Sequence, residues 1–295
     1  MARPRYAIVE APSVLGLFPK GVERLPEALL GAGLADRLGA RRAGRVEPPP
    51  YDPRRDPPTG LLNPAGIAAY STALADAVGL VCGAGEVPVV LGGDCSILLG
   101  CLLPLRRRGR FGLLFLDGHA DFYQPEAEPN GEAASMDLAL ATGRGPAVIT
   151  DLEGLRPLVR DEDVVAFGIR DGEEAANFGS QRIEDSGIEL LDLAAIRQAG
   201  FDAALERALD WLTRPELFGV WVHLDADVLD DAVMPAVDYR MPGGLSFDEL
   251  ATVLAAVAAS GRLAGIDITI FNPALDPDGT IAAAFSDAIA RGLRS

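Results

Sequence analysis

The feature that most constrains this sequence is an alternation of short β-rich runs ending in Gly or Asp with longer Ala/Leu-rich stretches at helical spacing. That alternation is typical of βαβ units, whose strands form a parallel sheet. The expected strands are residues 5–10, 87–91, 112–116, 164–168, 188–191, 220–224 and 263–270. The expected helices are residues 63–82, 96–105, 196–213, 246–259 and 280–293. The sequence therefore predicts an α/β protein.

The length favours one domain. A chain of 295 residues is long for a single domain, but a parallel sheet covered on both faces by helices uses that many. Two polar stretches, 46–58 and 123–131, are interpreted as loops because neither separates regions of different composition. We therefore expect residues 1–295 to form a single domain. Within it, Ser246 with Glu249 three residues later predicts a capping box at a helix start.

Composition and charge exclude several classes of partner. The formal net charge is -17, from 43 acidic and 26 basic residues, and a field of that sign repels phosphate backbones. Nucleic acid is therefore not an expected partner, whereas a small cationic substrate or a metal is compatible with this charge. We expect no membrane span, because no apolar run reaches the ~18 residues needed to cross a bilayer. The three cysteines are too few for a disulfide framework, and the N-terminus lacks a signal-peptide pattern, so a cytoplasmic protein is expected.

Acidic residues gather directly after three of the expected strands, where ligands bind in an open parallel sheet. These segments are Leu-Gly-Gly-Asp-Cys-Ser at 91–96, Leu-Asp-Gly-His-Ala-Asp at 116–121 and Leu-Asp-Ala-Asp at 224–227. A single Asp-x-Asp is more often a turn or a helix cap. Several such carboxylates converging on one point would repel each other unless a cation lay between them. The pattern predicts a divalent-metal site.

These motifs resemble those of the arginase, agmatinase and formimidoylglutamase family, the ureohydrolases. Residues 92–96 are similar to the family's Gly-Gly-Asp-His-Ser, and residues 117–121 to its Asp-Ala-His-x-Asp. The run from Asp225 to Leu245 follows the family's Asp-x-Asp pattern and keeps its Gly-Gly-Leu, and residues 168–171 and 272–273 match further elements. The resemblance implies a three-layer α/β/α, arginase-like fold with a mainly parallel central sheet of about eight strands. It also implies a homo-oligomer, a trimer or a hexamer.

The resemblance carries over a centre of one or two Mn²⁺ ions. It implies that Asp117 and Asp225 bridge the metals and that His119 and Asp227 complete one site. Asp121 and residue 95 would complete the other, with Asp121 also accepting a proton from the attacking water. Asp94 and Asp230 are interpreted as residues that fix the loops.

Position 95 departs from the family, because it is Cys where the family has His. A thiolate is softer than an imidazole and favours Zn²⁺ or Fe²⁺ over Mn²⁺ if Cys95 coordinates. A neutral thiol packed as a small side chain is the alternative reading. Relatives that hydrolyse N-hydroxyarginine are similar in carrying Cys at this position, so the resemblance implies that the change is compatible with activity.

Two further departures affect the substrate. The family's proton-shuttling His is absent from the segment 134–137, and the glutamate that holds the guanidinium corresponds to Ile270. Isoleucine cannot pair with two N–H groups of a planar cation. We expect His223, one residue out of phase with the ligands, to be a packed or hydrogen-bonded core histidine. The residues considered for substrate contact or as the substitute acid are Tyr123, Glu126, Glu128, Glu132, Asp137, Glu173, Asp267 and Ile270.

The sequence thus predicts a manganese-dependent hydrolase of a C–N bond in an amidino, guanidino or N-hydroxyguanidino compound, with a non-standard substrate. The alternative is a catalytically degenerate member of the fold with a binding or assembly role. A nucleotide-binding Rossmann protein is disfavoured, because Gly92-Gly93 lacks the Gly-x-Gly-x-x-Gly spacing.

Overall fold

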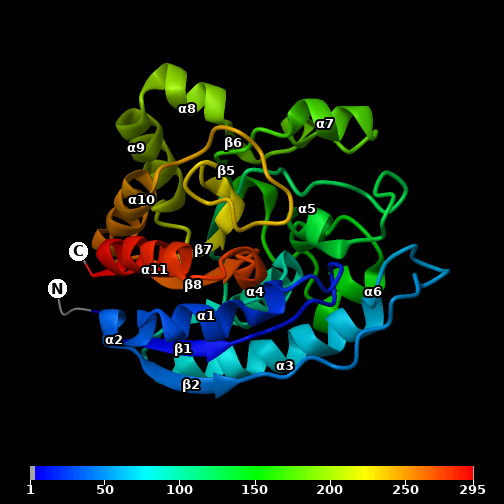
Figure 1. Ribbon diagram of the computed structural model, residues 1–295. Helices are drawn as coiled ribbons and strands as arrows, with labels where there is room; N and C mark the ends of the chain where they lie inside the picture. Colours follow the sequence, from blue (N-terminus) through cyan, green and yellow to red (C-terminus); the bar gives the residue numbers. More distant parts are fainter. Residues whose placement is uncertain (1–3, 295) are drawn as a thin grey trace.

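Eight parallel strands form one sheet in the order β2-β1-β3-β8-β7-β4-β5-β6 (Figure 1). The computed structural model describes residues 4–294. The strands are β1 (Tyr6–Glu10), β2 (Arg41–Arg45), β3 (Val87–Leu91), β4 (Gly112–Leu116), β5 (Val164–Phe167), β6 (Glu189–Leu191), β7 (Val220–Asp225) and β8 (Leu263–Thr269). Every residue of β1, β4, β5 and β7 is buried, as expected for strands covered on both faces.

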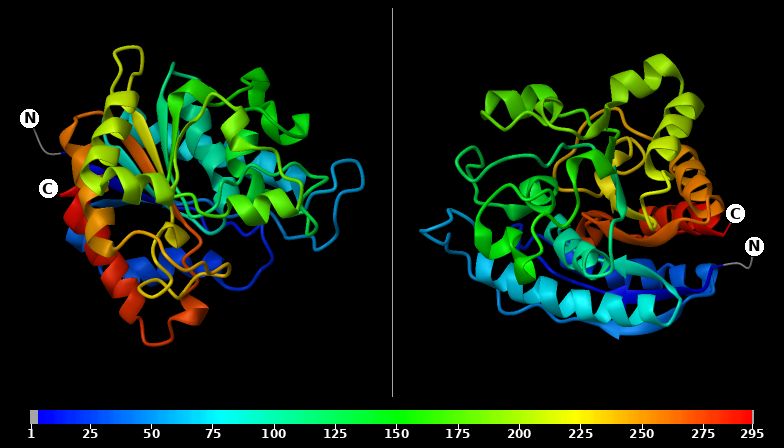
Figure 2. Two further views of the ribbon diagram at one scale, coloured as in Figure 1. Left: turned by 90° about the horizontal axis from the view of Figure 1, so that it is seen from above. Right: turned by 180° about the vertical axis from the view of Figure 1, so that it is seen from behind.

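Helices cover both faces of the sheet (Figure 2). They are α1 (Leu25–Gly31), α2 (Leu34–Leu38), α3 (Pro64–Gly83), α4 (Leu98–Arg106), α5 (Asp137–Ala141), α6 (Ala147–Thr150), α7 (Gly172–Asn177), α8 (Leu193–Ala199), α9 (Phe201–Leu212), α10 (Phe247–Ala259) and α11 (Thr280–Leu293). Short 3₁₀ turns include η2 (Cys95–Ile97), η3 (Ala133–Met136) and η7 (Ala226–Val228).

Alternate residues of each central strand pack in two separate hydrophobic cores, one on each face of the sheet. In β1, Tyr6 and Ile8 pack in the core shared with α1, α2, α9, α10 and α11, whereas Ala7 and Val9 pack in the core shared with α3, α4 and α5. This division follows from the two-residue period of a strand. The three-layer α/β/α prediction is confirmed.

The structure contains short helices that were not expected, namely α1, α2, α5, α6 and α7, and it differs from the expected elements elsewhere as well. Strand β2 was not expected, and the helix expected at 196–213 is divided into α8 and α9 at Gly200, where φ is 90°. The helix expected to begin at Ser96 begins instead as the 3₁₀ turn η2 and continues as α4.

Helix α3 corrects the expectation about apolar runs. Within residues 4–294, its 20 residues are long and apolar enough to cross a membrane by length and composition alone. The helix is rich in Ala and Gly and contains one charged residue, Asp76, which explains its high mean hydropathy. The helix packs against α4, β3 and β1, and buried residues such as Ile67, Leu74 and Val78 line one of its faces. Its apolar character is that of a core helix.

Strands β3, β8, β7 and β4 are neighbours at the centre of the sheet. Their carboxyl ends share one edge because all four run in the same direction. The loops that follow these strands therefore converge, and they carry the candidate site.

Candidate metal centre

The segments after β3, β4 and β7 are fixed by side chains that accept hydrogen bonds from backbone N–H groups. Asp94 accepts from the N–H groups of Ser96 at 2.8 Å and Gly16 at 3.2 Å, and it is fully buried. Asp117 Oδ1 accepts from the N–H of His119 at 2.7 Å, and Asp225 Oδ1 accepts from the N–H of Asp227 at 2.8 Å. Both oxygens of Asp94 are thus held by backbone N–H groups, whereas in Asp117 and Asp225 the turn pins Oδ1 and leaves Oδ2 for other contacts.

The first candidate group, which we call the His119 cluster, consists of Asp117, His119 and Asp227. One ligand atom from each lies within 4.8 Å of the others. His119 Nδ1 lies 3.0 Å from Asp227 Oδ2 and 3.8 Å from Asp117 Oδ1. The donors are carboxylate oxygens and one imidazole nitrogen, a set that suits Mn²⁺.

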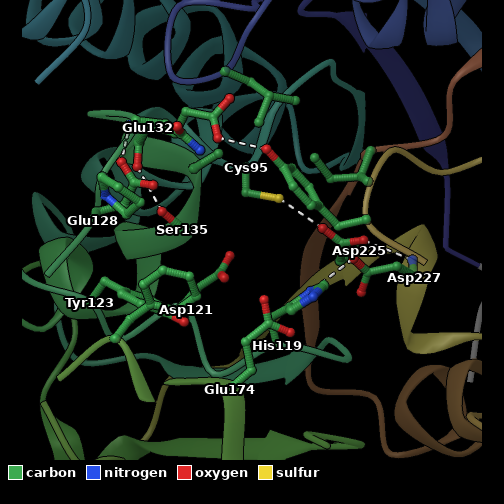
Figure 3. Close-up of a pocket in the computed structure, with 17 residues that line it drawn as sticks. Cys95, His119, Asp121, Tyr123, Glu128, Glu132, Ser135, Glu174, Asp225 and Asp227 are labelled. Carbon is green, nitrogen blue, oxygen red and sulfur yellow. Dashed lines mark hydrogen bonds and ion pairs between the residues drawn. The ribbon is translucent and has the colours of Figure 1, made fainter. Parts of the chain in front are cut away.

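The second group, which we call the cysteine cluster, is built around Cys95. Two sets satisfy the same 4.8 Å limit: Cys95 with Asp121 and Asp137, and Cys95 with His223 and Asp225. The thiol donates to Asp225 Oδ2 at 2.9 Å, and Figure 3 shows Cys95 and Asp225 joined in this way beside Asp121 and His119. Cys95 is therefore not an isolated packed thiol, because it faces potential ligands from β7 and two loops.

The electrostatics of both clusters favour a bound cation. Burial and neighbouring carboxylates raise the pKa of Asp117 and Asp121 well above the ordinary value. Burial, followed by the charge of Asp227, raises the pKa of Asp225 to about 7. Burial lowers the pKa of His119, but the neighbouring carboxylates, Asp227 foremost, together outweigh burial and raise this pKa to about 9. A divalent cation at this point would relieve the repulsion that opposes ionisation.

Orphaned polar atoms provide a second test of fit. Among the described residues, Asp117 Oδ2, both Asp137 oxygens and His223 Nε2 are buried without a hydrogen-bond partner. Buried carboxylates are costly without a partner or a cation. The side chains present therefore fit a divalent metal centre.

A cavity of about 190 Å³ opens onto the clusters (Figure 3). Its lining includes Cys95, His119, Asp121, Asp225 and Asp227 from the clusters. Leu17, Ala134 and Ile270 contribute apolar surface to the wall. The remaining wall includes Glu128, Glu132, Glu174, Tyr123, Phe178 and Tyr239.

The residues expected to contact substrate fall in different places. Tyr123, Glu132 and Ile270 line the cavity. Glu132 already accepts hydrogen bonds from the N–H of Phe18 at 3.1 Å and the hydroxyl of Tyr239 at 2.9 Å. Asp137 is fully buried and belongs to the cysteine cluster rather than to the open wall. Glu173 is exposed on α7, and its neighbour Glu174 lines the cavity instead.

The expectation that His223 is out of phase with the ligands is wrong for Asp225. His223 and Asp225 are two residues apart in β7, so they share a face of the strand. The expected hydrogen-bonded core position is confirmed, because His223 is fully buried and its Nδ1 lies 2.6 Å from Asp267 Oδ2. Its other nitrogen, however, faces the cysteine cluster. The two-residue period was the signal that would have identified it.

Comparison with known proteins gives the same assignment as the motifs. The sequence model of the arginase family matches residues 12–293. The arginase of Staphylococcus aureus (strain COL) is 28% identical over 283 residues, which cover 93% of this chain and 92% of that protein. The arginase of Bacillus caldovelox is 29% identical over 281 residues, covering 92% and 91%. Its native crystal structure superposes with a TM-score of 0.89 at 26% identity, covering 99% of each chain. The arginase-like fold is thereby confirmed, and this chain belongs to the arginase family, the ureohydrolases.

Proposed function

We propose that this chain hydrolyses a C–N bond of a small amidino, guanidino or N-hydroxyguanidino compound with the help of divalent metal. The observation that supports the proposal most directly is the meeting of the His119 cluster and the cysteine cluster at one cavity, since three sets of ligand atoms there each lie within 4.8 Å of one another. Family membership adds the reaction class. Asp117, His119 and Asp227 would hold one ion, and the cysteine cluster the other.

Bound metal lowers the pKa of a water ligand towards neutrality, which provides hydroxide without a strong base. The chain itself supplies a proton carrier. Asp121 lines the cavity and is only 7% exposed, and its backbone φ of 43° holds it in the left-handed region. A carboxylate in that position accepts a proton from the attacking water and delivers it to the departing amine.

The cavity wall favours a substrate that is less basic than an ordinary guanidine. Ile270, Ala134 and Leu17 place apolar surface where a guanidinium needs a bidentate acceptor. An N-hydroxylated or otherwise weakly basic leaving group needs less proton transfer, which compensates for Ala134 at the segment where family arginases carry a histidine. The carboxylates of Glu128 and Glu174 remain to bind an amine elsewhere on the substrate.

The test is turnover by the purified full-length chain, stripped with chelator and reloaded with Mn²⁺, on guanidines, N-hydroxyguanidines and amidines. We expect at least one compound to release urea or its analogue. Asp227→Asn should lower kcat/KM by on the order of 100-fold, because it removes a ligand. The matched control is Asp231→Asn, which breaks only a partly exposed pair with Arg240 and should retain full activity.

Turnover also separates hydrolysis from the alternative. If the metal-loaded chain binds its ions but leaves every compound intact, the hydrolase proposal is wrong. A catalytically degenerate protein with a binding or assembly role would then be the better description. Ala134 and Ile270 are the observations that favour this second candidate.

Three finer expectations belong to the same proposal. They are manganese as the native ion of at least the His119 cluster, a homo-oligomer that is a trimer or a hexamer, and a cytoplasmic location. Family resemblance supports each of them. Metal analysis of protein purified without added metal and light scattering of the same sample test the first two.

A further inference from the structure

His223 is held in one orientation beneath the cavity floor. Its Nδ1 lies 2.6 Å from Asp267 Oδ2, and Asp267 Oδ1 accepts a hydrogen bond from the indole N–H of Trp221 at 2.5 Å. The imidazole also stacks on Phe115, with ring centroids 4.8 Å apart. An imidazole whose Nδ1–H is donated to a carboxylate keeps a lone pair on Nε2, which is the arrangement found behind metal-ligating histidines.

The free nitrogen points at other atoms that lack partners. His223 Nε2 lies 3.6 Å from Asp137 Oδ2 and 4.0 Å from Asp117 Oδ2. In the part of the chain that the structure describes, none of these three atoms has a hydrogen-bond partner, and all three side chains are fully buried. Both distances exceed those of a hydrogen bond. Nε2 of His223 is therefore not engaged by either carboxylate.

Cys95 completes the arrangement from the turn η2, which follows β3. Its Sγ lies within 4.8 Å of His223 and Asp225 ligand atoms, and within the same distance of Asp121 and Asp137 ligand atoms. An ion that bonds sulfur at about 2.3 Å and nitrogen at about 2.0–2.1 Å requires these two atoms to lie no more than about 4.4 Å apart. The 4.8 Å limit that the ligand atoms of Cys95, His223 and Asp225 satisfy lies close to that requirement.

We propose that His223 and Asp137 ligate the metal of the cysteine cluster together with Cys95 and Asp225, and that this site takes Zn²⁺ or Fe²⁺ rather than Mn²⁺. The mixed sulfur, nitrogen and oxygen donors select a borderline ion, whereas the His119 cluster keeps the donors that suit Mn²⁺. The chain would thus hold two different metals. Cys95 stands where the family has a histidine ligand, and in this proposal His223 of β7 supplies an imidazole ligand to the same ion. The inference rests on the proposed function only in requiring that the cavity floor binds metal, and not on turnover.

Diffraction from wild-type crystals of the metal-free chain soaked with Zn²⁺ tests the position. We expect an anomalous peak at the zinc edge about 2.0–2.3 Å from both His223 Nε2 and Cys95 Sγ. A peak in the His119 cluster alone, or one that leaves His223 out of reach, would overturn the proposal. This measurement needs no variant that must fold.

Cobalt spectroscopy in solution tests the ligands one at a time. Co²⁺ added to the metal-free wild type should give a thiolate-to-metal charge-transfer band in the near ultraviolet and the visible bands of low-coordinate cobalt. Cys95→Ser should abolish the charge-transfer band. His223→Gln should keep that band, shift the visible bands and weaken Co²⁺ binding by more than the roughly 10–100-fold that is typical of losing a residue behind a ligand. Cys82→Ser, which alters a half-buried thiol on α3, is the matched control and should change nothing.

The outcomes separate this inference from the proposed function. A charge-transfer band that survives His223→Gln with unchanged visible bands and affinity shows that His223 is not a ligand, and the inference is then wrong. Cobalt bound without a thiolate band also overturns it, while a metal-dependent hydrolase that uses the His119 cluster would stand. Turnover that fails in a protein showing both cobalt signatures would instead leave this site intact and remove the hydrolase proposal.

Discussion

Ile270 combines backbone strain with a position in the cavity wall. Its φ of 68° lies in the left-handed region, which is a genuine outlier for a β-branched residue. Such a conformation costs about 1–3 kcal/mol and persists where the surroundings fix it. Here the N–H of Ile270 donates to the carbonyl of Gly93 at 2.8 Å, and the side chain lines the cavity beside the clusters. The strained backbone thus presents an apolar group where the family resemblance implies a carboxylate.

Replacement of Ile270 tests whether this side chain sets the substrate. Ile270→Glu should tighten the binding of a basic guanidine such as arginine by at least about 10-fold, because a hydrogen bond to a charged group is worth about 1.5–3 kcal/mol. Calorimetric titration of the metal-loaded protein measures the dissociation constant without requiring turnover. Ile270→Gln is the control, since it relieves the same strain and adds polarity without charge. Equal affinity in the two variants would contradict the prediction.

The sequence motifs allowed the site positions of the residues within them to be predicted. Residues that reach the site only through tertiary packing could not be assigned to it in this way. Asp117, His119, Asp225 and Asp227 follow strand ends, and their convergence follows from a parallel sheet. Asp137 carried no such signal, because it begins a short helix in a loop segment and reaches the cysteine cluster only through the tertiary fold. That meeting depends on distances that sequence spacing does not encode.

Helix α10 begins with the capping box that the sequence predicts. Ser246 Oγ accepts from the N–H of Glu249 at 3.1 Å, and Glu249 Oε2 accepts from the N–H of Ser246 at 2.8 Å. Ser246→Ala should destabilise the protein by about 1 kcal/mol and lower Tm by a few degrees, with activity unchanged. Thr252→Ala is the control on the exposed face of the same helix, where the hydroxyl donates to the carbonyl of Asp248 and caps nothing. Similar losses of Tm in both variants would contradict the role of the cap.

Long elements with a clear hydrophobic pattern were predictable, whereas several short helices and strand β2, which lacks such a pattern, were missed. Strand β2 has the sequence Arg-Arg-Ala-Gly-Arg and lies at the edge of the sheet. Its Arg42 and Arg45 form ion pairs with Glu10 of β1, so charge complementarity holds a strand that hydropathy does not mark. The division between α8 and α9 was missed for another reason, because a single Gly200 is compatible with a continuous helix in sequence. That the chain forms one domain stays a prediction.

At the scale of the whole molecule, the buried acids make stability depend on protons and metal together. In the metal-free protein, burial and then the charge of Asp227 raise the pKa of Asp225 from 3.8 to about 7, and Asp117, Asp121 and Asp137 are raised as well. Between pH 3.8 and about pH 7 the native state therefore binds more protons than the unfolded chain, so the free energy of unfolding falls as pH rises. The pKa of His119 is raised to about 9, which extends the same trend above neutral pH. Asp227 acts in the opposite sense, but its pKa is lowered from 3.8, so its contribution is lost only in stronger acid.

Bound metal should oppose this loss of stability at higher pH. We expect the Tm of chelated protein to be lower at about pH 7.5 than at about pH 5.5, and Mn²⁺ at about 100 times its Kd to raise Tm by roughly 5–10 °C at the higher pH. The gain should shrink at about pH 5.5, because protons compete with metal for the same carboxylates. Asp225→Asn, which removes one titrating ligand, should flatten the pH dependence of the metal-free protein, whereas Asp231→Asn should leave it unchanged. A metal-free Tm that rises with pH over this range, with no response to Mn²⁺, would mean that these acids are satisfied without a cation, and the metal centre would have to be abandoned.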